Sequence, residues 1–136
     1  MFLELHPLVI HFPIALFSSA VLFDCIAIVF KKNELLMTSW WVMLLALFSS
    51  VFAIITGLID DNLIGHLFTT SPLWDNHGLM QIISIVIFLS IFIWRTKQPA
   101  LFDSKKYIFI YLLIGLTNVV ILFYGSHIGA ILSGRV

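Results

Sequence analysis

Histidine is the residue type in this chain whose chemistry is most specific. The 136 residues include five histidines, and two of them, His6 and His11, stand beside Pro7 and Pro13 in the stretch "HPLVIHFP". Imidazole is a common ligand of transition metals and of haem iron, so histidines that converge on one place predict a metal or haem site. Whether they converge depends on the elements that carry them.

The composition is that of a membrane protein. Hydrophobic residues make up 61% of the chain and charged residues only 10%, which is more apolar surface than a soluble domain of this size can bury. We therefore expect the lipid bilayer to surround it. The net charge is zero and there is no basic tract, so the sequence predicts no nucleic-acid partner.

Four apolar stretches are long enough to cross a hydrocarbon core as helices. They are residues 7–30, 40–59, 78–94 and 107–125. No charge follows the fourth until Arg135, so its helix either continues to Leu132 or turns into the interface. Backbone polar groups cannot stay unpaired in lipid. The sequence therefore predicts an all-α, polytopic membrane protein, with residues 1–136 forming a single bundle of four transmembrane helices.

The basic residues predict the orientation of the bundle. Six of the seven lie in the linkers after the first and third spans, and Arg135 is the exception. Basic linkers stay on the cytoplasmic side. We therefore expect both termini on the outer, periplasmic side of a bacterial inner membrane.

This orientation places all five histidines in the outer half of the protein. His6 and His11 begin the first span, His66 lies in the outer loop, His77 opens the third span and His127 lies near the end of the fourth. We expect Pro7 to start its helix and Pro13 to bend it so that His11 points inward. The alternative is that these histidines are simply tolerated at helix ends.

Other polar residues fit a pocket beside the histidines. Gln81 lies one turn after His77 on the same face and should point into the bundle. Gly125 and Gly129 flank His127 in the stretch "GSHIG". Such small residues either let two helices pack closely or make room for a flat macrocycle.

Asp24 is the carboxylate that lies deep within a predicted span, where charge is costly and usually paired or functional. Lys31, seven residues later on the same helix face, could screen it by snorkelling. Asn118 and Ser90 are alternative partners across the bundle. Asp24 therefore has two open interpretations, as a structural polar contact between helices and as a proton-handling group.

Several motifs together resemble a family of small predicted membrane proteins, domain of unknown function 2231. They are "HPLVIHFPIALF" at 6–17, Asp24, "TGLIDD" at 56–61, "NHG" at 76–78 and "GSHIGAIL" at 125–132. The resemblance covers nearly the whole chain, although this chain ends in "SGRV" instead of the Val-Tyr and Gly-Val-Gly tail usual in the family.

The resemblance implies a set of characteristic polar positions, which are His6, His11, Asp60, His77 and His127. His66 lies outside the family pattern. The family is distantly similar to four-helix b-type cytochromes, which hold haem between helix histidines, and this similarity implies a haem site.

Three functions are compatible with these observations. In the first, two of His11, His77 and His127 ligate a b-type haem near the outer face, with His6 too near the interface to be a first choice. Electrons would then pass between a quinol and a periplasmic or membrane partner, so any enzymatic role would be that of a redox component. His11 and His77 could meet across the bundle diagonal.

In the second function, the histidines form a Cu, Zn or Fe site with a carboxylate from Asp60, Asp61 or Asp75. In the third, the chain is a structural subunit of a larger membrane complex.

Overall fold

The chain folds into a bundle of long helices. The computed structural model describes the backbone of residues 5–64 and 76–132, and the side chains of residues 9–59 and 76–131. The elements are α1 (Leu5–Phe30), α2 (Asn33–Ile64), α3 (His77–Lys97), the short 3-10 helix η3 (Pro99–Asp103) and α4 (Lys105–Leu132). The four α-helices are long and apolar enough to span a membrane, which confirms the predicted all-α, four-span architecture.

Two helices extend well beyond the predicted spans. α2 begins at Asn33 rather than near residue 40, because α1 ends in a tight turn. In that turn Lys31 has a φ of 53°, and the amide of Lys32 donates to the carbonyl of Ala27 at 2.9 Å. α4 continues to Leu132, which resolves the choice left open by the sequence. Hydropathy predicts how much of a helix fits in lipid, whereas the helix itself continues as long as its backbone remains hydrogen-bonded.

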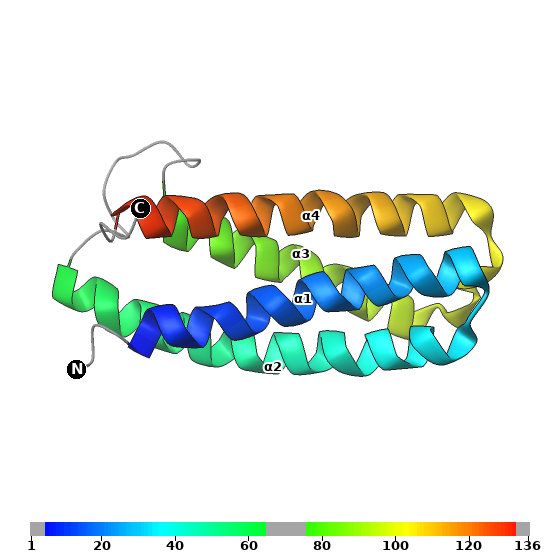
Figure 1. The fold of residues 1–136 in the computed structure, drawn as a ribbon, viewed down its shortest axis with the longest axis horizontal. Helices are drawn as coiled ribbons and strands as arrows, with labels where there is room; N and C mark the ends of the chain where they lie inside the picture. The colour runs from blue at the N-terminus through cyan, green and yellow to red at the C-terminus, as the bar shows by residue number, and fades with distance from the viewer. Residues whose placement is uncertain (1–4, 65–75, 133–136) are drawn as a thin grey trace.

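Successive helices run antiparallel (Figure 1). α1 packs beside α2 and α3 beside α4, while α1 also contacts α4 and α2 contacts α3. α1 and α3 therefore lie diagonally across the bundle, as expected. The start of α1, the start of α3 and the end of α4 lie at the end of the bundle drawn at the left of Figure 1. Since these segments carry His11, His77 and His127, we call this the histidine end.

Exposed lysines mark the opposite end of the bundle, which we call the lysine end. They lie in the α1–α2 turn, at the end of α3 and at the start of α4, and are Lys31, Lys32, Lys97, Lys105 and Lys106. The described histidines and these lysines thus lie at opposite ends of the bundle. The charge pattern of the sequence predicts this separation, with the histidine end outside and the lysine end in the cytoplasm.

A stacked pair of aromatic rings, which we call the aromatic layer, lies in the core of the bundle. Phe17 of α1 and Phe88 of α3 stack with centroids 4.1 Å apart and planes within 5°, and both side chains are fully buried. The buried residues of α3 alternate in steps of three and four, and are Gln81, Ser84, Phe88, Ile91 and Arg95. This spacing is that of a helix seam directed into a bundle core. It brings three polar residues of α3 into the interior.

Local caps fix the ends of α3. The side chain of Asn76 accepts a hydrogen bond from the amide of Leu79 at 3.1 Å, which satisfies one of the unpaired amides of the first turn. At the other end the amide of Gln98 donates to the carbonyl of Trp94. η3 follows immediately and buries Leu101 against the core. The connection to α4 therefore closes over the lysine end of the bundle.

Candidate functional site

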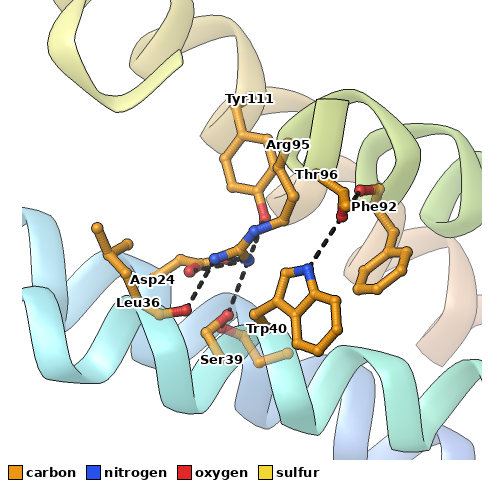
Figure 2. A network of polar contacts seen from close by, with 9 residues as sticks. Asp24, Leu36, Ser39, Trp40, Phe92, Arg95, Thr96 and Tyr111 are labelled. Carbon is orange, nitrogen blue, oxygen red and sulfur yellow. Dashed lines mark hydrogen bonds and ion pairs between the residues drawn. The ribbon is translucent and has the colours of Figure 1, made fainter. Parts of the chain in front are cut away.

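A buried ion pair lies near the lysine end. Nη1 of Arg95 on α3 lies 3.0 Å from Oδ2 and 3.2 Å from Oδ1 of Asp24 on α1, as Figure 2 shows. The side chain of Asp24 is 0% exposed and that of Arg95 only 3%. Two opposite charges that are both removed from water and lipid compensate each other only if their remaining hydrogen-bonding groups are also paired.

Neighbouring groups supply that pairing. Arg95 Nη1 also lies within hydrogen-bond distance of Ser39 Oγ at 3.1 Å and of Tyr111 Oη at 2.9 Å. The Tyr111 hydroxyl in turn donates to Asp24 Oδ2 at 2.7 Å. Nη2 of Arg95 donates to the carbonyl of Leu36 at 2.9 Å. The network therefore joins all four helices, since Ser39 and Leu36 belong to α2 and Tyr111 to α4.

Aromatic rings cover the Arg95 guanidinium. Its Cζ lies 5.2 Å from the ring centroid of Phe102 in η3 and 5.6 Å from that of Tyr111, within the range of a cation–π interaction. Leu101 of η3 is buried at the same end. Trp40 donates from Nε1 to Thr96 Oγ1 at 2.9 Å and thereby ties α2 to α3 beside the network.

The structure corrects the expected partners of Asp24. Lys31 is exposed in the turn, and the ion-pair partner is Arg95. Asn118 instead donates to the backbone carbonyl of Ser84 at 2.8 Å. Ser90 donates to the carbonyl of Val86 on an exposed face of its own helix. These expectations were wrong because Asp24 pairs with a residue that the sequence pattern had assigned to a cytoplasmic linker.

Sequence reasoning missed Arg95, Tyr111 and Ser39. Arg95 counted only as one of the basic residues that predict orientation, yet it continues the stripe of α3 that includes Gln81 and Ser84. Extending that spacing of three and four residues to position 95 would have placed it in the core. Ser39 and Tyr111 carry no comparable signal, because isolated serine and tyrosine residues are common on any transmembrane helix.

At the histidine end, His77 is held against α4. Its Nδ1 lies 2.6 Å from the carbonyl oxygen of Gly125. A carbonyl can only accept, so Nδ1 carries the proton and donates. A Cβ added at Gly129 would lie 2.6 Å from both Nδ1 and Cε1 of His77. Gly129 therefore makes room for the imidazole ring of His77, whereas a Cβ added at Gly125 would instead approach Met80 and Gln81 at 3.1 and 3.2 Å.

Gln81 continues the same contact one turn deeper. Its Nε2 donates to Ser126 Oγ at 3.0 Å and approaches the carbonyl of Leu122 at 3.2 Å. Gln81 is buried, which confirms the expectation that it points into the bundle. Together with Asn118 and Ser84, it forms a polar seam between α3 and α4.

His11 and His127 lie on exposed faces of their helices. Pro13 is buried, whereas His11 shares its exposure with Phe12 and Ala15. The expectation that the proline aims His11 inward is therefore wrong, because Pro13 itself occupies the inward position. A role for His11 or His127 in binding a ligand remains a prediction.

Several predicted positions fall outside the described side chains. His6 lies in α1, and Asp60 and Asp61 lie in α2, but only their backbone is described. His66 and Asp75 lie outside the described residues altogether. Within the side chains that are described, no three histidine, cysteine, aspartate or glutamate residues are grouped as a metal site.

The chain belongs to the family described as "Predicted membrane protein (DUF2231)", whose model matches residues 3–136. The match covers nearly the whole chain and agrees with the resemblance carried by its motifs. The searches of curated proteins and of solved structures gave no match.

Proposed function

We propose that this member of the family binds a b-type haem at its histidine end, with His77 as an axial ligand, and carries electrons within the membrane. The observation that supports this proposal is the hydrogen bond from His77 Nδ1 to the Gly125 carbonyl. Histidines that bind metal ions commonly donate their other ring nitrogen to a carbonyl or carboxylate, which fixes the tautomer and the ring orientation. In the neutral form of His77 this bond leaves the lone pair on Nε2.

The surroundings of His77 fit a group attached at the end of the bundle. Gly129 leaves room for the imidazole, because a Cβ at this position would overlap the ring. The stacked rings of Phe17 and Phe88 fill the centre, so a haem ligated by His77 would lie on the histidine side of that layer. One proximal histidine is sufficient to hold haem iron. Bound haem would supply a one-electron carrier, and a quinol and a periplasmic or membrane protein are the redox partners that we propose.

The remaining assignments follow from this proposal. His11, His127 and His6 are the candidates for a second ligand, all of them on helix segments at the histidine end. The lysine end would face the cytoplasm of a bacterium and the histidine end the periplasm. A Cu, Zn or Fe ion bound by His77 and the other histidines with Asp60, Asp61 or Asp75 is the alternative, since imidazole serves either centre. The third alternative is a structural subunit, which the extensively paired Asp24–Arg95 network would serve without a cofactor.

A visible spectrum of the detergent-purified protein, before and after dithionite, tests the proposal. Haem gives a Soret band with reduced α and β bands, and a parallel metal analysis identifies copper, zinc or iron without haem. We expect His77→Ala to abolish the haem spectrum and His66→Ala to leave it unchanged. If His11 is the second ligand, His11→Ala should abolish the spectrum or leave a five-coordinate one.

Two results would overturn the assignment. Full haem occupancy in a variant that lacks both His11 and His77 would show that neither is needed. A colourless wild-type protein that contains copper or zinc would transfer His77 to the metal alternative, and a protein with neither haem nor metal would favour the structural role.

A further inference from the structure

Two unpaired polar atoms lie in the middle of the α3–α4 seam. Ser84 is 0% exposed and Asn118 1% exposed. Ser84 Oγ and Asn118 Oδ1 have no hydrogen-bond partner within the part of the chain that the structure describes. Asn118 lies about halfway along α4 and Ser84 about a third of the way along α3, both within segments that can span a membrane. A buried hydroxyl or amide oxygen without a partner costs roughly 1–3 kcal/mol, so native proteins rarely leave one unpaired.

The two residues are in direct contact. Asn118 Nδ2 donates to the backbone carbonyl of Ser84 at 2.8 Å, so the side-chain amide of Asn118 lies directly against the turn that carries the Ser84 hydroxyl. Asn118 Oδ1 on α4 is therefore available as an acceptor, and the Ser84 hydroxyl on α3 can both donate and accept. Their chemistry suits a small ligand that also donates and accepts, and water is the one available to every membrane protein.

The geometry points to an internal water molecule bound by Ser84 and Asn118 in the middle of the bundle. It would accept or donate at Ser84 Oγ and donate to Asn118 Oδ1, and so satisfy both atoms. The Gln81–Ser126 contact lies one turn nearer the histidine end, followed by the His77–Gly125 contact. The water molecule is the innermost member of a polar seam that begins at the histidine end.

The seam ends at the aromatic layer. Phe88 follows Ser84 by one turn on α3, and its stack with Phe17 separates Ser84 from the Asp24–Arg95 network. Ile91 is also buried between Phe88 and Arg95. Buried apolar side chains therefore lie between the proposed water site and the ion pair. This inference stands independently of whether haem is bound.

Magnetisation transfer from water in NMR spectra of the detergent-solubilised full chain tests the site, with the side-chain amide of Asn118 as the probe. We expect water cross-peaks at the Asn118 amide protons of the wild type. Ser84→Val fills the space of the hydroxyl with a methyl group and should remove them. Ser90→Ala, on an exposed face of the same helix, is the matched control and should keep them.

The effect of Ser84→Ala on stability is a second test, because a hydrated site and a dry site predict changes of opposite sign. If Ser84 binds water, Ser84→Ala removes a partner from that water and should lower the ratio of folded to unfolded protein about fivefold. If the site is dry, the same substitution removes an unpaired buried hydroxyl and should raise the ratio. Absent water cross-peaks in the wild type, cross-peaks that persist in Ser84→Val, or a stabilising Ser84→Ala would each overturn the proposal.

Discussion

The Asp24–Arg95 pair should behave as one energetic unit. Each charge is buried against the other, so the loss of one partner leaves an uncompensated charge in the core. Replacement of both residues removes the ion pair and leaves no uncompensated charge in the core. We therefore compare Asp24→Leu, Arg95→Met and the double variant, because leucine and methionine are apolar and approximate the shapes that they replace.

The structure sets the magnitudes. Asp24→Leu leaves Arg95 without its carboxylate and Tyr111 without the acceptor at 2.7 Å, and removing one partner of a buried pair costs about 3–5 kcal/mol. Arg95→Met should cost a similar amount. In the double variant only neutral groups lose partners, namely the Tyr111 and Ser39 hydroxyls and the Leu36 carbonyl, at about 1 kcal/mol each. The double variant should therefore be more stable than either single variant.

Unfolding in mixed detergent micelles with increasing dodecyl sulfate, followed by circular dichroism, measures these differences. Ser90→Ala serves as the control, since Ser90 lies on an exposed face and its hydroxyl donates to the carbonyl of Val86 in its own helix. If the losses of the two single variants simply add in the double variant, Asp24 and Arg95 act independently and the reasoning is refuted.

Three further predictions rest on single positions. Gly129→Ala should displace the His77 ring, cost about 1–3 kcal/mol and weaken any cofactor signal, whereas Gly115→Ala, whose Cβ meets its nearest atom at 3.4 Å, should be tolerated in both assays. Asp24→Asn and Asp24→Ala should lower protein stability alike if the carboxylate is structural; an Asn variant that folds normally but transfers electrons slowly would instead indicate proton handling. Reporter tags at both termini should respond from the periplasm and a tag near Lys105 from the cytoplasm, and a cytoplasmic N-terminus would contradict the orientation.

The fold was predictable because lipid imposes strong constraints. A segment of about 20 apolar residues that must satisfy its own backbone can only be a helix, and the linkers are too short for another domain. Helix ends were less predictable, as α2 and α4 show. The turn at Lys31 depends on a left-handed backbone conformation, which hydropathy does not record.

The site was predictable only where periodicity applied. Gln81 points inward because it shares a helix face with Ser84 and Phe88. His11 is exposed, whereas Pro13 and Ile14 are the buried positions nearest to it among the described side chains of α1. The hydrogen bond from His77 to Gly125 could not be predicted, because it depends on how closely α3 approaches α4 at the two glycines.

Arg95 shows why a charge must be placed in three dimensions before it is used to predict orientation. By position it follows an apolar span and counts as a linker residue, but its guanidinium is buried and neutralised by Asp24. A charge that is paired in the core exerts little of the electrostatic effect that keeps basic linkers in the cytoplasm. If Arg95 is left out of the count of basic residues, five exposed lysines still lie at one end of the bundle. The predicted orientation therefore depends on those lysines, while Arg95 holds together the helices that they flank.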